Sequence, residues 1–225
     1  MELVYQCVNV LRKDLLQQWR ARARLAAVGV FGLTTLLLFS FANGPDTLML
    51  RANAAGYLWL ALLLCSTLSL AESFRIEMQN GALEGLLLLP TDPRAIYYGK
   101  ALANLAVLTV LGVGLIPVMV GLYDTSIPGG VVPLAGVIAL GSAGLVAPGT
   151  LYSALSARAR GSDVLLPLLL FPLVVPALLS SVKATSLILA GDPMHQLPSW
   201  LGLLAAFNVI YWSLCGLLFG RVVED

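Results

Sequence analysis

The sequence predicts an all-α, polytopic membrane protein with six transmembrane helices, and three observations support this prediction. Hydrophobic residues make up 59% of the 225 residues and charged residues only 11%, whereas soluble domains carry about 25% charged residues. Six apolar runs approach or exceed the roughly 20 helical residues needed to cross a hydrocarbon core about 30 Å thick. The charged residues are confined to the tails and connections between these runs.

This composition excludes several classes of protein. A mean hydropathy of +0.89 leaves too little polar surface for a soluble enzyme or a disordered tail. The net charge of +1 offers no basic patch for a nucleic acid. The odd number of cysteines, Cys7, Cys65 and Cys215, argues against a disulfide framework.

The first 24 residues are predicted to form an amphipathic helix at the cytoplasmic membrane surface. One helical face is apolar and contains Val4, Cys7, Val8, Leu11, Leu15 and Trp19. The other is polar and contains Gln6, Asn9, Arg12, Lys13, Gln17 and Arg20. A helix of this kind lies in the interface, with its apolar face against membrane lipid and its arginines at the headgroups.

Six membrane-spanning helices are expected to follow, and none of the predicted spans contains an ionisable residue. Their approximate ranges are 25–42, 54–71, 101–122, 131–155, 164–182 and 199–220. Ionisable residues inside a membrane usually mark ion or proton pathways. A proton-coupled pump, a voltage sensor and a charged-filter channel are therefore disfavoured, and energy for directed transport has to come from outside the spans.

The distribution of Lys and Arg predicts that both termini are cytoplasmic. Eleven of the 13 basic residues fall in the tails and in the second and fourth connections. Only Arg51 and Lys183 fall on the opposite side, where Lys183 is expected to begin the outer connection 183–198. Because connections rich in Lys and Arg stay in the cytoplasm, the longest connection, 72–100, is expected there.

Proline and glycine recur in the later spans. Pro167, Pro172 and Pro176 make the fifth span a candidate for helix bending during a change of state. The alternative for the small residues is close helix packing. Asn208, in the sixth span, is expected to make an interhelical hydrogen bond rather than a ligand contact.

The candidates for chemistry are weak. His195 lies in the outer connection without a Cys or carboxylate at ligand spacing, so it makes a poor metal site, and a haem-ligand role is a minor alternative. Ser142 as an intramembrane nucleophile lacks a Gly-x-Ser-x-Gly context and a nearby base. The sequence therefore predicts no catalytic residue, no metal and no bound cofactor.

The second connection, 72–100, is the most informative segment. Phe74, Glu77 and Met78 fall at helical spacing before Asn80-Gly81, and a second short helix is expected over 83–89. Short amphipathic helices under a membrane domain suit docking into a groove of a soluble partner. No P-loop accompanies Gly99-Lys100, because Ala101 follows it and Arg94 occupies the earlier glycine position. ATP would have to be bound by a partner.

Two motifs resemble those of known transporter subunits. The first is Glu-x-Phe-Arg-x-Glu-x-x-x-Gly-x-Leu-Glu-x-Leu-x-Leu-x-Pro over residues 72–90. With six spans and an N-terminal interfacial helix, it resembles the permease subunits of type 2 ABC exporters. The second is Val-Leu-Leu-Pro-Leu-Leu-Leu-Phe-Pro-Leu-Val-Val-Pro over 164–176. Together with Phe-Arg-x-Glu-x-Gln-x-Gly-x-Leu-Glu over 74–84, it makes the whole chain similar to the heme exporter protein B family.

The resemblance implies one ABC-2-type transmembrane domain over residues 1–225, in a bacterial cytoplasmic (inner) membrane. It implies an ABC ATPase partner, heme exporter protein A, that docks beneath 72–100. It also implies association with heme exporter proteins C and D and with a periplasmic haem chaperone. Finally, it implies that the chain forms a homodimer. The expected residues of the ATPase-coupling interface are Glu72, Phe74, Arg75, Glu77, Gly81, Leu83, Glu84 and Pro90.

The implied function is haem delivery to the periplasm for c-type cytochrome biogenesis, with ATP hydrolysed by the partner. Two mechanisms stay open: haem crosses this subunit as cargo, or hydrolysis drives release of haem-loaded chaperone. Spans without cationic side chains favour the second, because haem propionates would lack charge partners. The competing functions are a type 2 ABC exporter for a lipid or drug and, less favoured, an intramembrane enzyme.

Overall fold

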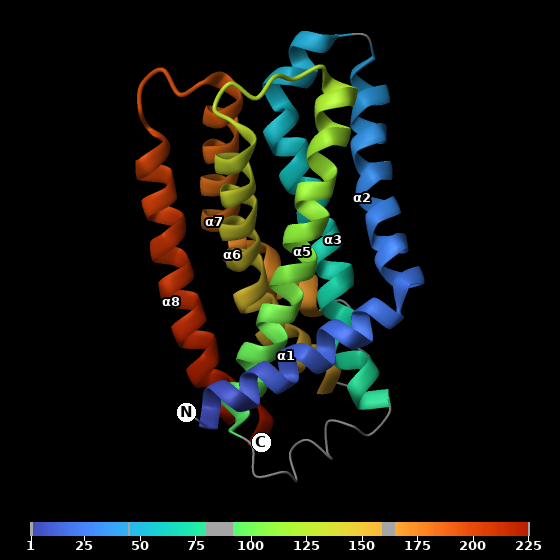
Figure 1. Cartoon of the computed structure of the whole chain (residues 1–225), viewed down its shortest axis with the longest axis vertical. Helices are drawn as coiled ribbons and strands as arrows, with labels where there is room; N and C mark the ends of the chain where they lie inside the picture. Colours follow the sequence, from blue (N-terminus) through green and yellow to red (C-terminus); the bar gives the residue numbers. More distant parts are fainter. Residues whose placement is uncertain (1, 45, 80–91, 159–164, 225) are drawn as a thin grey trace.

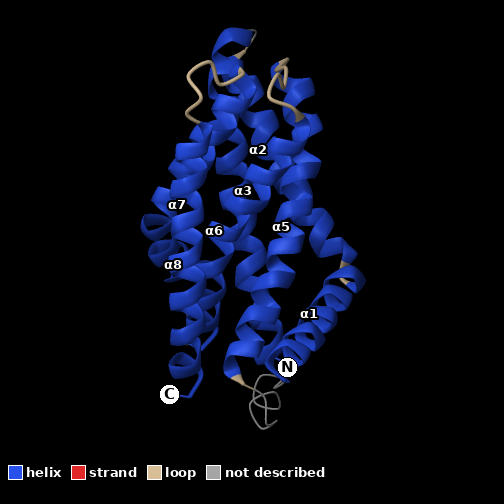
Figure 2. Ribbon diagram, turned by 60° about the vertical axis from the view of Figure 1, so that its left-hand side comes forward, coloured by secondary structure: helices blue, strands red, loops and turns tan. Residues whose placement is uncertain are grey.

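The computed structural model describes residues 2–44, 46–79, 92–158 and 165–224. These residues form seven α-helices and no strand (Figures 1 and 2). The helices are α1 (Glu2–Arg20), α2 (Arg22–Asn43), α3 (Thr47–Gln79), α5 (Pro93–Tyr123), α6 (Val131–Arg158), α7 (Leu165–Ala190) and α8 (Leu197–Glu224).

Six of these helices, α2 to α8, are long and apolar enough to cross a membrane. They run up and down in one bundle, and α1 lies across its lower end, against α5 (Figures 1 and 2). The two ends of the chain lie at this same lower end (Figure 1). The prediction of a polytopic all-α membrane protein is confirmed.

Helix α1 has three faces, whereas the sequence pattern predicts two. The predicted apolar stripe is largely exposed in the protein, as Val4, Val8 and Trp19 illustrate at 64%, 51% and 66% exposure. A different face, which includes Val10 and the buried Asp14, packs against α5. The exposed stripe suits contact with lipid, so one helix can face the membrane and the protein at once.

Small residues allow close packing between the helices of the bundle. A Cβ atom added to Gly112 of α5 would lie 2.5 Å from Ile138 of α6, and one added to Gly149 would overlap Leu70 of α3. The close-packing interpretation is confirmed at such positions. It does not extend to every glycine, because Gly114, for example, faces open space.

Two of the three candidate bending prolines lie inside α7. Pro172 and Pro176 are both exposed on the outer face of the helix. The Ser180 hydroxyl donates a 2.7 Å hydrogen bond to the Pro176 carbonyl. Pro167 falls in the first turn of α7, where a missing N–H costs no helical hydrogen bond. Bending of α7 during a change of state stays a prediction.

The helices continue past the predicted apolar runs, so ionisable residues occur in the same helices near the ends of these runs. Arg51 and Glu72 lie in α3 and Lys100 lies in α5, just outside the predicted ranges 54–71 and 101–122. Lys183 lies within α7, which continues to Ala190, so the outer connection begins later than predicted. The Lys183 side chain is exposed, and a long aliphatic stem lets such a charge reach the membrane surface.

Candidate functional site where α1 meets α3 and α5

The structure describes only part of the predicted coupling interface. Glu72 and Phe74 lie near the lower end of α3. Arg75 and Glu77 belong to the same helix, but their side chains lie outside the described part. Four further candidates fall outside the described residues altogether: Gly81, Leu83, Glu84 and Pro90.

The two flanks of the predicted connection are continuations of membrane helices. Helix α3 runs without a break to Gln79, since neither Gly nor Pro interrupts it beyond Gly56, so the helix predicted from Phe74, Glu77 and Met78 is confirmed as a continuation of α3. The second helix, expected over 83–89, lies outside the described residues. Helix α5 already begins at Pro93, where the Asp92 side chain accepts a 2.9 Å hydrogen bond from the Arg94 N–H. An aspartate cap followed by proline is a strong helix start.

Phe74 is fully buried, which does not fit its predicted place on a partner-docking surface. Its ring lies 6.0 Å from the Phe219 ring of α8, measured between centroids. The Lys100 ammonium lies 4.8 Å from its centroid on another side. Phe74 therefore joins α3 to α5 and α8, and a partner could reach it only after the helices separate.

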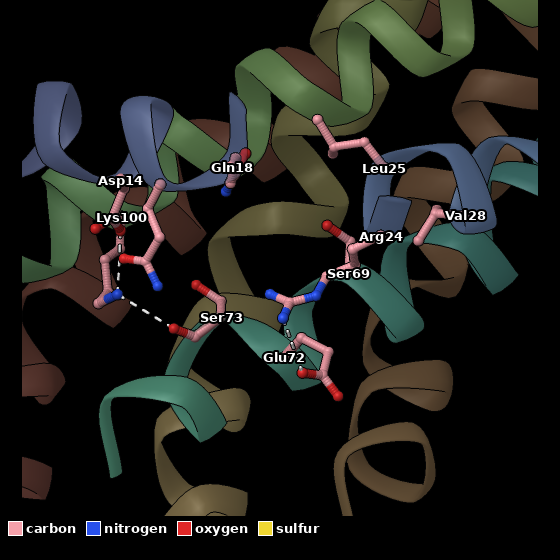
Figure 3. A pocket seen from close by; sticks show the side chains of 10 residues that line it. Asp14, Gln18, Arg24, Leu25, Val28, Ser69, Glu72, Ser73 and Lys100 are labelled. Carbon is pink, nitrogen blue, oxygen red and sulfur yellow. Dashed lines mark hydrogen bonds and ion pairs between the residues drawn. The ribbon is translucent and has the colours of Figure 1, made fainter. Parts of the chain in front are cut away.

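Glu72 lies at the edge of the junction and pairs with the start of α2. Its carboxylate is 3.9 Å from the Arg24 guanidinium, and the two side chains are 27% and 42% exposed. Figure 3 shows this pair beside Ser73 at the end of α3. A pair this exposed contributes at most about 1 kcal/mol to stability, so it can be exchanged for other partners.

The centre of the junction is a buried ion pair between α1 and α5. The Lys100 ammonium lies 3.1 Å from Asp14 Oδ2, and the two side chains are 2% and 6% exposed. Lys100 also donates a 3.3 Å hydrogen bond to the Ser73 carbonyl of α3, as Figure 3 shows. Three helices therefore converge on one cation.

Sequence reasoning missed this ion pair, although one signal was present. Asp14 occurs at helical spacing with Cys7, Val10 and Leu11, so a carboxylate interrupts an otherwise apolar face. A carboxylate on such a face requires a cation when the face is buried. Nothing in the spacing indicates that the cation is Lys100, 86 residues away.

Polar side chains extend the junction from α1 to α6. The Asn104 amide donates to Ser73 Oγ at 3.3 Å and to Thr150 Oγ1 at 3.5 Å. The Gln18 amide donates to Asn104 Oδ1 at 3.4 Å. Side-chain networks in a low-dielectric interior hold their members in one arrangement, so α1, α3, α5 and α6 are fixed relative to each other here.

A cavity of about 40 Å³ lies inside this junction (Figure 3). Asp14, Gln18, Arg24, Glu72 and Lys100 are among the residues that line it. The space suits one or two water molecules, and a porphyrin cannot fit. The junction is therefore an electrostatic connection between helices rather than a site for a large ligand.

Close packing of α1 on α5 depends on Gly99. A Cβ atom at this position would lie 2.6 Å from Val10 and 2.9 Å from the Cys7 carbonyl. Burial raises the pKa of the Cys7 thiol in the same helix. This close approach is what brings Asp14 within reach of Lys100.

The weaker candidates for chemistry, His195 and Ser142, lie in different parts of the structure. His195 is exposed in the α7–α8 connection, and its backbone N–H donates to the Asp192 carbonyl at 3.2 Å. Ser142 is buried within α6. No group of three or more His, Cys, Asp or Glu that could hold a metal occurs among the described residues.

The interhelical bond expected of Asn208 is confirmed: its amide donates to the Leu140 carbonyl of α6 at 3.0 Å.

Comparison with known proteins identifies the family. The family model described as CcmB protein matches residues 5–224. The chain belongs to this family. It is 31% identical to heme exporter protein B of Pseudomonas aeruginosa over 200 residues, which is 88% of either chain. It is 33% identical to heme exporter protein B of Paracoccus denitrificans over 190 residues, covering 84% of this chain and 86% of the relative. The family resemblance seen in the sequence is confirmed.

Proposed function

We propose that this chain is the membrane subunit of an ABC transporter complex that delivers haem to the periplasm for c-type cytochrome biogenesis. The observation that carries the proposal is the family match over residues 5–224, together with relatives named heme exporter protein B that align along most of their length. The six spanning helices agree with a permease subunit. Its place is the bacterial inner membrane, with residues 1–225 acting as one transmembrane domain.

The energy comes from ATP bound by a partner, heme exporter protein A in this proposal. The sequence has no P-loop at Gly99-Lys100 or elsewhere. Heme exporter proteins C and D and a periplasmic haem chaperone complete the complex, and two copies of the chain provide two equivalent docking sites. The ATPase subunits bind on the cytoplasmic side, where the Lys and Arg residues are concentrated.

The junction of α1, α3 and α5 supports segment 72–100 as the coupling element. This segment joins the end of α3 to the start of α5, and both helices continue from it into the bundle. Lys100 is bonded to α1 and to α3, and Glu72 is paired with α2. A displacement of the segment by the ATPase would therefore move four helices together.

The buried charges favour release of haem-loaded chaperone over passage of haem through this subunit. In the described part of the chain, Lys100 is the buried cation, and it is engaged by Asp14. Two propionates crossing the bundle would lack a free cationic partner, which is costly in a dry interior. In this mechanism a neighbouring subunit binds haem, and this chain transmits the conformational change that ATP hydrolysis drives.

The decisive experiment measures the ATPase activity of the reconstituted complex with and without this chain and haem-loaded chaperone. We expect full activity only when both are present. Replacing Glu84 with lysine should uncouple hydrolysis from cytochrome c maturation and leave membrane insertion intact. The matched control is Asp124→Lys at the opposite end of the bundle, where the carboxylate is 74% exposed and its ion pair with Arg51 contributes at most about 1 kcal/mol. Normal maturation in the Glu84→Lys variant would refute the coupling role, and stoichiometric haem on the isolated chain would refute the release mechanism.

A further inference from the structure

An apolar groove opens where α1 turns into α2 beside the middle of α5. Its volume is about 260 Å³. The lining residues include Leu15 and Trp19 of α1, Leu25 of α2, and Ala106, Val110 and Leu111 of α5. Trp19 and Val110 are 66% and 71% exposed, so the groove is open to the surroundings of the protein.

The groove lies at the level where a membrane surface meets its apolar interior. Helix α1 lies across the lower end of the bundle, whereas α2 and α5 span it (Figures 1 and 2). The exposed apolar stripe of α1, which includes Val4, Val8 and Trp19, continues into the groove through Trp19. The surroundings of the groove are therefore lipid, with headgroups beside α1 and acyl chains beside α5.

One arginine, Arg22, lies at the edge of the groove. The Arg22 guanidinium lies over the Trp19 ring, 5.3 Å from its centroid. No carboxylate of the described residues lies within ion-pairing distance of Arg22. Arg20 precedes it in the chain and is exposed, whereas Arg24 is paired with Glu72. An apolar groove with a cationic edge complements a ligand that has an apolar chain and an anionic head.

The start of α2 adds to this complementarity. Ala21 precedes the helix without a side-chain hydrogen bond to its first N–H groups, and the first turn holds no acidic residue. Arg22 and Arg24 are instead placed at the positive end of the helix dipole, where a positive charge is unfavourable. The Arg24 and Leu25 N–H groups donate to the Ala21 carbonyl, so a phosphate beside the first turn would meet Arg22 and the N–H groups that precede Arg24.

We propose that this groove is a binding site for one anionic glycerophospholipid of the cytoplasmic leaflet. One acyl chain lies along Ala106, Val110 and Leu111, and the phosphate lies beside Arg22 at the start of α2. The bound lipid fills the angle between α1 and the bundle. This inference concerns lipid binding only and is tested without haem, ATP or partner subunits.

Native mass spectrometry of the purified full-length protein tests the site. The protein is titrated with equimolar phosphatidylglycerol and phosphatidylcholine that carry identical acyl chains. We expect one saturable phosphatidylglycerol per chain, bound in preference to phosphatidylcholine by about fivefold or more, since one cation near a membrane surface contributes about that factor. Arg22→Gln should remove most of this preference.

Two variants test the groove itself. Ala106→Phe should fill it and lower bound phosphatidylglycerol by about tenfold, and Val110→Trp should block its mouth without entering the helix packing. Ala206→Phe, on the exposed face of α8, and Arg221→Gln, in its last turn, are the matched controls and should bind lipid as the unmodified protein does. Equal binding of the two lipids would overturn the proposal. So would undiminished binding in both groove variants, an equal loss in the controls, or recovery of a different hydrophobic ligand from the groove.

Discussion

Replacing Lys100 with methionine should strongly lower the free energy of unfolding, although lysine and methionine side chains are similar in length. The substitution removes the buried ammonium 3.1 Å from Asp14 Oδ2 and leaves the carboxylate, 6% exposed, with only Lys13, whose ammonium lies 3.2 Å from Oδ1 and whose side chain is 42% exposed. It also removes the hydrogen bond to the Ser73 carbonyl and the cation above the Phe74 ring. Loss of the buried counterion is strongly destabilising, and Lys13 compensates for it only weakly because water screens an exposed ammonium.

The magnitude follows from the geometry. At an effective dielectric constant of about 20, unit charges 3.1 Å apart attract by about 5 kcal/mol, which offsets the cost of removing both from water. Truncating one partner of such a pair costs about 3–5 kcal/mol. We expect this loss for Lys100→Met and a similar loss for Asp14→Leu. The double variant should lie within about 1 kcal/mol of the unmodified protein, because an apolar pair needs no counterion.

The assay is reversible unfolding of the full-length protein by SDS in mixed micelles, followed by tryptophan fluorescence. The control is Arg51→Met, which breaks the ion pair with Asp124 at the other end of the bundle. Those side chains are 48% and 74% exposed, so its loss should change the free energy of unfolding by no more than about 1 kcal/mol. The reasoning is refuted if Lys100→Met costs as little as Arg51→Met, or if the double variant is as unstable as the sum of the singles.

Three further predictions concern α1 and the bundle. Gly99→Val should force α1 away from α5 through overlap with Val10 and cost about 1–3 kcal/mol, whereas Gly121→Val in open space should not, and limited proteolysis within α1 distinguishes the two. Because burial raises the pKa of Cys7 above the ordinary value of 9.0, its alkylation rate, followed by peptide mass spectrometry, should still be rising above that pH; a midpoint at or below 9.0 would contradict the packing. Trp59→Phe should cost about 1 kcal/mol beyond its packing loss, because the indole N–H donates to α7 at 2.9 Å, and an unchanged free energy of SDS unfolding would count against that bond.

The bundle could be predicted from the sequence because each span is a local property. An apolar run of sufficient length forms a helix in a membrane whatever its neighbours are. The ends of the helices are harder to predict, since Lys100 and Lys183 adjoin apolar runs and so look like helix limits in the sequence. A helix ends where its backbone hydrogen bonds end, and a lysine with a long stem or a partner does not end it.

The candidate site was predicted only in part. Segment 72–100 and the family could be recognised from residue types and spacing in one stretch of chain. The burial of Phe74 could not be recognised in this way, because it depends on Phe219 of α8 and on Lys100 of α5. An aromatic residue in a connection looks the same in the sequence whether it meets a partner or its own bundle.

The sequence by itself determined the six spans, the amphipathic first helix, the concentration of positive charge in the tails and two connections, and the family. These features depend on residue type and on neighbours within a few helical turns. Tertiary structure alone decided that Asp14 meets Lys100, that Phe74 is buried, and that Trp19 and Val110 share a groove. Each of these contacts joins residues far apart in the chain. The ion pair and the groove exist because α1 lies against α5 and the chain turns at Ala21, whereas Phe74 is buried because α3 packs beside α5 and α8.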